Sequence, residues 1–449
     1  MKLKHELPGL PGIDTAGQQR AWSFLTCLQR DSFAYFLHEV SDHTGLVRDK
    51  TKQGWPASIA ATGMALTVYP IGVERGWMSR GHALERTLLT LRFLAGSTQG
   101  TQADASGYRG FYYHFLEMES GARAWNCELS SIDTALLIAG VLAAAAYFRG
   151  DGDDEVQLRA LANQLYWRVD WAWMCNHNEL MCHGWKPECD FLPFHWAGYD
   201  EALILYVLAL GSPTHPIAPA CYGAWLRSYD VRSIYGIELV EAGSLFIHQM
   251  SHMWIDFRAI RDSFMRAHDS DYFENSRRAT LVQRQYAIEN PLKFEQYGEC
   301  CWGITASDGP GEVVRAVRGV ERTFYDYKAR GAPDGPDDGT LAPWAVVASL
   351  PFAPEIVMPA LQGFAQRRLH EAKPYGFKAA FCPTFSDAEG NGWVSPYHFG
   401  INLGPTVAMI ENYRSDMVWG LMRQCPPIVN GLRLAGFEGG WLAHPEVSR

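Results

Sequence analysis

Helical periodicity dominates this sequence and constrains its fold more than any other feature. Apolar residues recur three and four positions apart through about a dozen segments, as expected when one face of each helix is buried. Ser79 and Ser131 are typical N-cap residues, and Pro354 and Pro405 are typical of a first helical turn. The predicted helices cover residues 15–40, 58–68, 79–94, 131–148, 154–174, 199–210, 218–229, 244–267, 271–289, 311–320, 341–350, 354–370 and 405–421.

Strand signals are few. Short β-like pieces occur near residues 231–240 and 379–385. No segment repeats at a period of roughly 20–50 residues, which argues against a solenoid. We therefore predict an all-α fold of the toroid type, in which inner and outer helices pair and leave a cleft at one end.

Long loops rich in Gly, Pro and aromatic residues join the predicted helices, notably 184–198, 297–310 and 331–339. The length of 449 residues fits one large domain or two ordinary ones. Residues 331–339 are the best linker candidate, but their composition is that of a surface loop. We predict a single domain over residues 1–449, with the long loops forming the cleft.

The acidic composition limits the partners of this protein. A formal net charge of −10 argues against nucleic acid and anionic membranes, because both require a basic face. It fits a neutral or cationic substrate. The 16 Trp indicate either a large aromatic core or a cleft lined with rings, because an exposed indole is costly without a use.

Export and membrane signals are not visible in the sequence as printed. Residues 1–12 contain no apolar h-region, and the apolar run 136–148 is too short to cross a bilayer. This predicts a cytoplasmic protein, or a periplasmic one if an export signal has been removed. The ten cysteines follow no small-scaffold spacing, so we expect reduced, buried thiols.

Residues 110–134 form the segment richest in chemistry. His114, Trp125, Glu128 and Asp133 fall in a short polar stretch just before an Ala-rich apolar helix. A helix N-terminus stabilises negative charge, which favours ionised carboxylates at this point. The alternative is that both carboxylates only stabilise the N-terminus of the helix. Glu128 is poorly placed to cap it, because this residue precedes the helix.

Residues 185–201 repeat this architecture, with an aromatic loop followed by acids at the start of an apolar helix. Asp200 and Glu201 point in different directions, so at most one faces a cleft, and we choose Glu201. Glycoside hydrolysis needs two carboxyl groups flanking the scissile bond, one of them a proton donor. The alternative is that these acids only complement the helix dipole.

Two His-containing clusters raise the question of a metal. His248, His252 and Asp256 are spaced i, i+4, i+8, which predicts one face of a helix, but Gln249 stands where a zinc-protease helix has its general base. A polar stripe facing the cleft is the favoured interpretation. A second group has no CxxC pair, so zinc is again disfavoured; it contains Cys175, His177, Cys182, His183 and Cys189.

Residues 297–310 form a Gly-rich polar loop around Trp302. The loop lacks a phosphate-binding Lys, which disfavours nucleotide binding, and the chain has no G-x-S-x-G serine-hydrolase elbow. Trp302 is interpreted as a sugar platform, with Ser307 and Asp308 as hydroxyl partners. The alternative is a loop packed around its own Trp.

In these segments the chain resembles the glycoamylase-like proteins grouped with glycoside hydrolase family 144. That family includes endo-β-1,2-glucanases and a sophorose-releasing enzyme. The resemblance implies a single (α/α)6 barrel and activity on β-1,2-linked glucose, with Glu128, Asp133 and Glu201 in the cleft. The matching segments follow one another along nearly the whole chain. They are residues 72–77, 127–134, 196–201, 210–216, 248–258, 275–280, 302–310, 375–377 and 409–414.

One position departs from the family pattern. The family usually reads Gly-Ile-Asp-Gln-Gly-Pro where this chain has Gly400-Ile-Asn-Leu-Gly-Pro405. Asn402 therefore stands where an acid is expected, and an amide cannot act as a general base. If the family acid helps to activate water, transfer to another sugar is favoured over hydrolysis in this chain.

Our leading hypothesis is a glycosidase in which Glu201 donates a proton and Glu128 is the second carboxylate. Asp133 has an orienting role at this site. The alternatives are a retaining β-1,2-glucan transglycosylase and a catalytically silent glucan-binding protein. We expect no cofactor and no metal, a glucan substrate, no nucleic acid or membrane partner, and a monomer or homodimer. The predicted sugar contacts are Trp125, Trp185, Trp196, Tyr199, Trp302 and Trp393 for rings, and Arg75, His114, His248, Asp256, Asp308 and Asn402 for polar groups.

Overall fold

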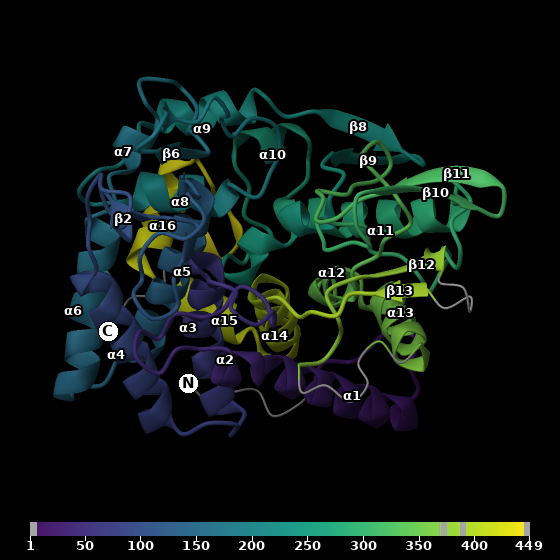
Figure 1. Ribbon diagram of the computed structural model, residues 1–449, viewed down its shortest axis with the longest axis horizontal. Coiled ribbons are helices and arrows are strands. Elements are labelled where there is room, and N and C mark those ends of the chain that lie inside the picture. The colour runs from purple at the N-terminus through teal and green to yellow at the C-terminus, as the bar shows by residue number, and fades with distance from the viewer. Residues whose placement is uncertain (1–6, 368, 370–374, 387–391, 444–449) are drawn as a thin grey trace. The chain divides into compact units, whose positions relative to one another are not determined.

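In the computed structural model, which describes residues 7–367, 369, 375–386 and 392–443, helices are joined by long loops and short β hairpins (Figure 1). The chain forms two compact units, each built from separate segments. The first unit takes its residues from Met1–Ala34, Asp230–Met250 and Phe273–Ser415. The second unit takes them from Tyr35–Tyr229, Ser251–Tyr272 and Asp416–Arg449.

The second unit contains most of the segments that carry the predicted acids. Its helices are α2 (Tyr35–His38), α3 (Ile59–Glu74), α4 (Arg80–Gly96), α5 (Ser131–Tyr147), α6 (Asp153–Trp167), α7 (Trp171–Met174), α8 (Leu203–Gly211), α9 (Pro219–Leu226), α10 (Ser263–Ala267), α15 (Met417–Met422) and α16 (Pro426–Leu434). Its short strands are β1 (Ala57–Ser58), β2 (Gly107–Tyr108), β3 (Phe111–Tyr112), β4 (Phe115–Leu116), β5 (Leu129–Ser130), β6 (Gly184–Lys186) and β7 (Asp190–Phe191).

Helices α3, α5 and α8 form the core of this unit and are buried along almost their whole length. A helix that is apolar all round has to lie inside a protein, because no face of it suits water. Helices α4, α6 and α16 leave one side exposed and pack on α3, α5 and α8 respectively (Figure 1). The unit therefore contains three pairs of a buried helix and a covering helix.

Helix α5 shows why these residues form a helix. The side chain of Ser130, not of Ser131, is the N-cap, and its Oγ accepts the backbone N–H of Asp133 at 3.1 Å. Ala, Leu and Ile then fill the helix, and Ala has the highest helix propensity. Burial on all sides supplies the rest of the stability, because an isolated helix of this length is marginal in water.

Glycines bring α3 and α5 together at Gly63 and Gly140. A Cβ atom on Gly140 would lie 2.0 Å from the carbonyl oxygen of Gly63, closer than any real contact. Only glycine allows two helix backbones to approach so closely. This contact sets the spacing of the two helices whose N-terminal ends carry the polar cluster described below.

The first unit holds most of the remaining elements. Its helices are α1 (Thr15–Phe33), the short 3₁₀ helix η1 (Leu245–His248), α11 (Tyr272–Glu289), α12 (Pro343–Ala348), α13 (Pro354–Gln366) and α14 (Gly400–Ser415). Tyr272, the first residue of α11, is counted with the second unit. Its antiparallel hairpins are β8 (Val231–Ile234) with β9 (Ile237–Val240), β10 (Val313–Val317) with β11 (Val320–Phe324), and β12 (Phe381–Ser386) with β13 (Gly392–Val394). Helix α14 packs against both α1 and α12.

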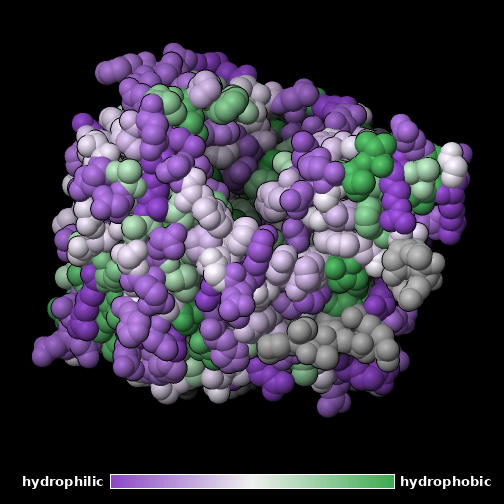
Figure 2. All heavy atoms as spheres, viewed as in Figure 1, coloured by the Kyte–Doolittle hydropathy of each residue, from purple (hydrophilic) through white to green (hydrophobic). Residues whose placement is uncertain are grey.

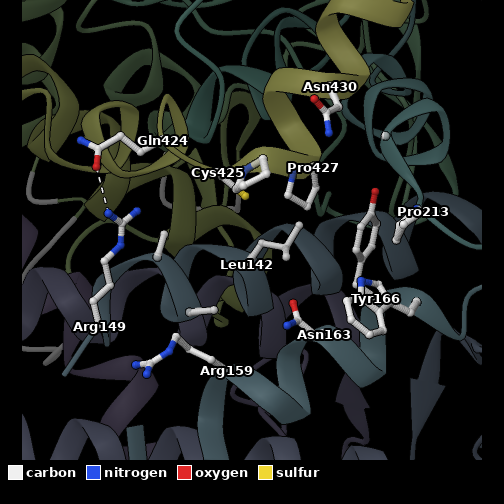
Figure 3. A pocket seen from close by; sticks show the side chains of 15 residues that line it. Leu142, Arg149, Arg159, Asn163, Tyr166, Pro213, Gln424, Cys425, Pro427 and Asn430 are labelled. Carbon is white, nitrogen blue, oxygen red and sulfur yellow. Dashed lines mark hydrogen bonds between the residues drawn. The ribbon is translucent and has the colours of Figure 1, made fainter. Parts of the chain in front are cut away.

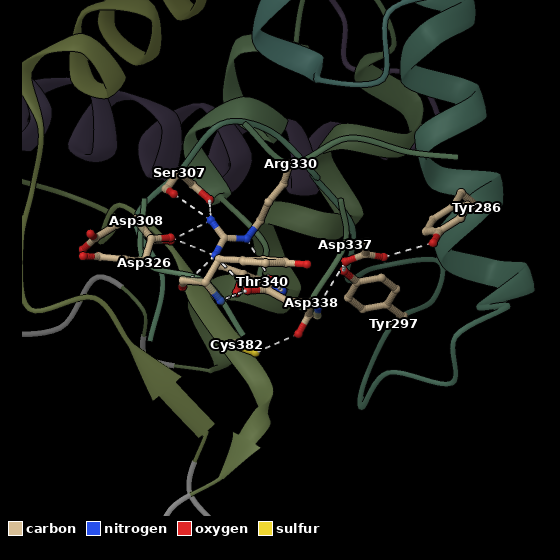
Figure 4. Close-up of polar contacts among 12 residues, drawn as sticks. Tyr286, Tyr297, Ser307, Asp308, Asp326, Arg330, Asp337, Asp338, Thr340 and Cys382 are labelled. Atoms are coloured by element: carbon tan, nitrogen blue, oxygen red, sulfur yellow. Dashed lines mark hydrogen bonds and ion pairs between the residues drawn. The ribbon is translucent and has the colours of Figure 1, made fainter. Parts of the chain in front are cut away.

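A buried ion pair anchors the 331–339 loop inside the first unit (Figure 4). The Arg330 guanidinium donates to both carboxylate oxygens of Asp338, at 2.7 and 2.8 Å, and both side chains are fully buried. It also donates to the carbonyl oxygen of Ser307 at 2.7 Å. A paired and fully hydrogen-bonded charge is tolerated in a core, so this loop is part of the unit and not a linker.

The predicted helix over residues 244–267 is wrong. The segment contains η1, a second 3₁₀ turn η2 (Met250–Met253) and an irregular stretch before α10. A side chain takes over a bond that a helix would make: the Asp256 carboxylate accepts the N–H of Arg258 two residues on, a donor that a helix would pair with the carbonyl of Trp254. Such local bonds compete with the helical hydrogen-bond ladder.

The predicted helix over residues 311–320 is also wrong, because the segment forms strand β10. Its valines are β-branched and favour the extended conformation. Arg318 and Gly319 both have positive φ, 48° and 79°, and form the two-residue turn to β11. Two left-handed residues match the twist of a tight hairpin, and this turn signal was overlooked.

Two further predicted helices have different boundaries in the structure, and each is divided into two helices. The segment 405–421 becomes α14, which begins earlier and holds Pro405 in its interior, followed by α15. The segment 154–174 is divided into α6 and α7. The hairpins at 231–240 and 381–394 confirm the two predicted β-like pieces.

Among the residues that the structure describes, no helix is both long and apolar enough to cross a membrane. On the face seen in Figure 2, hydrophobic residues form separate patches among hydrophilic ones.

Candidate active site

His114 lies at the centre of a cluster of carboxylates in the second unit. Its Nδ1 is 2.9 Å from Oε1 of Glu128, and its Nε2 is 3.6 Å from Oδ2 of Asp133. The backbone fixes this arrangement, because the N–H of His114 donates to the carbonyl of Glu128 at 2.9 Å. The N–H of Ile59, the first residue of α3, donates to the carbonyl of His114.

Two strands and one helix start position the carboxylates. Strand β5 runs directly from Glu128 into α5, so Asp133 falls in the first helical turn, where Ser130 Oγ also donates to it. Strand β5 pairs with β6 at Gly184, where a Cβ atom would lie 2.2 Å from the carbonyl of Leu129. Glycine at this position lets the two strands close beside Glu128.

The cluster holds an imidazolium between carboxylates. Burial by itself lowers the pKa of His114, but the charge of Asp133 and the hydrogen bond to Glu128 outweigh it and raise that pKa to about 9. Burial raises the pKa of Glu128, but the hydrogen bond and charge of His114 dominate and hold it below its ordinary value. At neutral pH His114 is therefore charged and Glu128 ionised.

Asp49 is a fourth charged group of this cluster, and the sequence analysis missed it. Burial raises the pKa of Asp49 to about 6, although the charge of His114 and a hydrogen bond from Trp55 oppose the rise. Trp55 Nε1 donates to Asp49 Oδ2 at 3.1 Å. A single Asp in a loop, more than sixty residues before His114, gives no sequence signal of this contact.

Glu201 lies in the turn before α8 and is half-buried. Burial raises the pKa of Glu201 to about 7; a backbone hydrogen bond opposes the rise and the charge of Asp133 adds to it. Its neighbour Asp200 instead accepts the N–H of Ala202 at 3.0 Å, as expected for two acids that point in different directions.

These groups match the two roles in glycoside hydrolysis. Glu201 keeps its proton up to about neutral pH, as a general acid requires. Glu128 is ionised at the same pH, as a base or nucleophile requires. Two carboxyls whose environments shift their pKa values in opposite directions are candidates for the acid and the base. Asp133 links the two, since it lies near His114 and its charge acts on Glu201.

Trp125 is an exposed ring beside the cluster. Its side chain is 54% exposed, and it adopts a left-handed φ of 55°. The ring contacts Phe115 and Trp55, with centroids 5.2 and 4.6 Å apart, and Phe115 stacks on His114 at 4.0 Å. An exposed Trp held by a strained backbone next to carboxylates is suited to stacking on a ligand.

The other aromatic candidates of this unit are packed within it. Trp196 Nε1 donates to Ser131 Oγ at 2.9 Å, and Trp185 Nε1 donates to Asp190 at 2.6 Å. Trp185, Trp196 and Tyr199 are all buried, with 6–8% of their surfaces exposed. Their rings pack against the loops of this unit, and their contact with sugar stays a prediction.

Arg75 does not lie near the cluster. It is the C-cap of α3, whose first residue, Ile59, bonds to His114. At 1.5 Å per residue, sixteen residues place Arg75 about 24 Å further along the helix axis. The prediction that Arg75 contacts sugar beside these acids is therefore wrong, because the predicted helix end at residue 68 concealed the full length of α3.

The predicted polar stripe on residues 248–256 does not form, because the segment is not an α-helix. His248 is buried, Nε2 bonds to the carbonyl of Ala242 at 3.0 Å, and burial lowers the pKa of His248 to about 4. Asp256 is bound by two arginines, with contacts of 2.7 Å to Arg258 and 2.5 Å to Arg423. Both side chains serve internal packing.

The remaining candidates belong to the first unit. Trp302 is completely buried, so the prediction of a sugar platform is wrong and the alternative, a loop packed around its own Trp, is correct. Asp308 is buried and accepts from Ser395 Oγ at 2.6 Å. Trp393 lies half-buried in β13. Asn402 is buried in the first turn of α14, and its carbonyl accepts from Thr406.

Among the described residues, no three or more His, Cys, Asp or Glu side chains are grouped to hold a metal ion.

Comparison with known proteins places these residues in a family context. Residues 193–426 match the sequence profile of the Glycoamylase family, described as "Putative glucoamylase". An exo β-1,2-glucooligosaccharide sophorohydrolase from Parabacteroides distasonis is 27% identical over 447 residues, covering 91% of this chain. The chain spans only 57% of the length of that curated relative.

Two solved structures are similar over almost the whole of both chains. A protein from Bacteroides uniformis, described as a "putative glucoamylase", has a TM-score of 0.82 and 30% identity, covering 94% of this chain and 98% of its own. An endo-β-1,2-glucanase from Chitinophaga pinensis, in complex with sophorotriose and glucose, has a TM-score of 0.82 and 27% identity, covering 94% and 99%.

Proposed function

This chain belongs to the glycoamylase family, and from that premise we propose that it is a glycoside hydrolase of β-1,2-glucan or β-1,2-glucooligosaccharides. The relatives described as a sophorohydrolase and an endo-β-1,2-glucanase support this substrate class. The observation that carries the proposal is that Asp133, which lies beside His114, also acts by its charge on Glu201, a carboxylic acid whose pKa is raised to about 7.

In the proposed reaction, Glu201 gives its proton to the glucosidic oxygen as the bond to the anomeric carbon breaks. The second carboxylate, Glu128, acts on the opposite face of the sugar, either on water or on the anomeric carbon. His114 holds Glu128 in place and keeps it ionised, and Asp133 adds to the high pKa of Glu201. Trp125 supplies a ring on which a sugar stacks.

The proposal includes the (α/α)6 barrel and a single domain over residues 1–449. The three pairs of buried and covering helices in the second unit are what such a barrel contains. The buried α12 and α14 of the first unit, with α13 and α1 packed on them, are compatible with further pairs.

The test is a panel of purified β-1,2-, β-1,3-, β-1,4- and β-1,6-glucans and α-glucans, with products resolved by mass and by anomer. The expected result is shorter products from β-1,2-glucan alone. The Glu201→Gln variant should release them about 10³-fold more slowly, whereas Glu85→Gln, an exposed position on α4, retains full activity. Equal products from other linkages, or full activity of Glu201→Gln, would contradict the proposal.

Asn402 favours a second candidate, a retaining transglycosylase. An amide at the position of the family acid cannot take a proton from water. In the transfer step the hydroxyl of a second sugar attacks the sugar held on Glu128, the bond to Glu128 breaks, and the hydroxyl proton passes to Glu201, which lost its own proton in the first step. Longer or cyclised products from β-1,2-glucooligosaccharides distinguish transfer from hydrolysis. Calorimetric binding of the same oligosaccharides, with no product after long incubation, would instead indicate a glucan-binding protein.

A further inference from the structure

A cavity of about 630 Å³ opens in the second unit, at the end of α5 and α8 remote from the carboxylate cluster (Figure 3). Helix α5 begins at Ser131, beside the cluster, and runs 17 residues to Tyr147. At 1.5 Å per residue its two ends are about 24 Å apart. Leu142 and Arg149 line the cavity at the far end, so it is separate from the candidate active site.

The walls of the cavity are held by close backbone packing. A Cβ atom on Gly211, the last residue of α8, would lie 2.1 Å from the carbonyl oxygen of Pro427 in α16. A Cβ on Gly431 would lie 2.0 Å from the carbonyl of Val207. Helices that meet backbone to backbone cannot move closer, so the space beside them stays open.

The charge of the lining is opposite to that of the protein. Among its fifteen residues two are arginines and none is Asp or Glu, whereas the whole chain has a formal net charge of −10. Arg149 donates to Oε1 of Gln424 at 2.9 Å. Arg159 donates to the carbonyl oxygens of Phe148 and Gly150, at 2.8 and 2.9 Å. The half-buried Arg159 is thus held by two carbonyl oxygens and Arg149 is exposed, and a guanidinium has five N–H donors, more than these bonds use.

The cavity has a charged side and an apolar side. In Figure 3, Arg149 and Arg159 lie on one side, Tyr166 and Pro213 on the other, and Leu142 between them. Arg159 and Tyr166 are spaced i, i+7 and so share one face of α6, about 10 Å apart along its axis. A ligand that satisfies both sides therefore needs an anionic head and an apolar body of about that length.

We propose that this cavity binds a small organic carboxylate with an apolar body. The carboxylate would accept from Arg149 and Arg159, and the body would lie along Leu142 toward Tyr166 and Trp167. An Arg–carboxylate contact is among the stronger charge-assisted hydrogen bonds, and a pocket of this volume is of the usual size for a small ligand. The site is independent of the carboxylate cluster and of any action on glucan.

The test uses decanoate and decanol, both below the concentration at which they aggregate. Binding is measured by calorimetry and by displacement of anilinonaphthalene sulfonate from the full chain. We expect decanoate to bind at least tenfold more tightly than decanol, and salt to weaken decanoate binding selectively. Equal affinities, or no binding of either compound, would overturn the proposal.

Variants locate the site. Arg149→Gln should reduce the affinity for decanoate about tenfold, and Ala145→Phe, which fills the cavity, should remove binding of both compounds. Arg92→Gln, an exposed arginine on α4 outside the lining, is the matched control and should change nothing. Unaltered binding in Ala145→Phe, confirmed as folded by its melting temperature, would refute this location. So would loss of binding in Glu201→Gln, which would place the ligand at the carboxylate cluster.

Discussion

His114 and Glu128 form a 2.9 Å hydrogen bond between an imidazolium and a carboxylate, fourteen residues apart in the chain. The same ring approaches Asp133 on its other side. Each partner alters the other: the carboxylates raise the pKa of His114 to about 9, and His114 lowers that of Glu128. We therefore propose that His114 positions the carboxylates, and its contact with sugar hydroxyls stays a prediction.

Replacing Glu201 by Gln is expected to lower kcat by about 10³-fold, within the usual range for loss of a general acid. The amide keeps the shape of the side chain, so the melting temperature should change little. Steady-state kinetics on β-1,2-glucooligosaccharides, with Glu85→Gln as the control, measure the effect. A loss of less than tenfold would remove Glu201 from the proton-donor role.

The pH dependence of the activity should follow the two carboxyls. Because the proton of Glu201 is needed, kcat/KM should fall as the pH rises through about 7. Because Glu128 must be ionised and its pKa is lowered, the acidic limb should lie below the ordinary range of a Glu. In Asp133→Asn the upper limb should move to lower pH, since the charge of Asp133 helps to raise the pKa of Glu201. An unmoved limb would contradict this coupling.

His114 should make the stability of the fold depend on pH. Its folded pKa, about 9, exceeds the ordinary 6.5, so its contribution is complete below about pH 6.5 and is lost as the pH rises through 9. His114→Asn should therefore cost about 3 kcal/mol at pH 6 and almost nothing at pH 10. Urea unfolding of both proteins at the two pH values measures the difference. The same deficit at both pH values would show that the loss is one of packing.

Two tryptophans of different exposure should respond differently to truncation. Trp125→Ala, at a 54% exposed ring, is expected to raise KM about tenfold, or 1.4 kcal/mol, with little change in melting temperature. Trp302→Ala, at a fully buried ring, is expected to destabilise the fold by about 3–5 kcal/mol. Thermal unfolding and kinetics on the same preparations test both. If Trp125→Ala changed stability instead of KM, the ring would be structural.

Gly140→Ala should destabilise the second unit by about 3 kcal/mol, because the added methyl meets the backbone of Gly63 at the crossing of α3 and α5. The gain in helix propensity, about 1 kcal/mol, is too small to offset this overlap. The control is Gly81→Ala on α4, where nothing lies within 4 Å and the change should be neutral or slightly stabilising. Denaturant unfolding compares the two variants, and similar stabilities would show that the helices can separate at little cost.

The sequence by itself determined the helical class, most helix positions and the segments that hold the acids. Local information is enough for these features: capping residues, the Ala-rich run of α5 and the apolar run of α8 act within a few residues of one another. Segments whose conformation depends on distant partners were predicted wrongly. The segment 244–267 has a helical sequence pattern, but the indole of Trp419 donates to the carbonyl of His252, which a helix would pair with a backbone N–H.

Only the tertiary structure decided which acids act together and which rings are exposed. Asp49 and His114 carry no sequence signal of each other, because their interaction arises where distant loops meet. Trp125 and Trp302 are the same residue type, and both lie in polar loop segments, yet one is 54% exposed and the other fully buried. The ionisation state and the exposure of a side chain depend on every group packed around it. The fold, and not the neighbours in sequence, determines which groups these are.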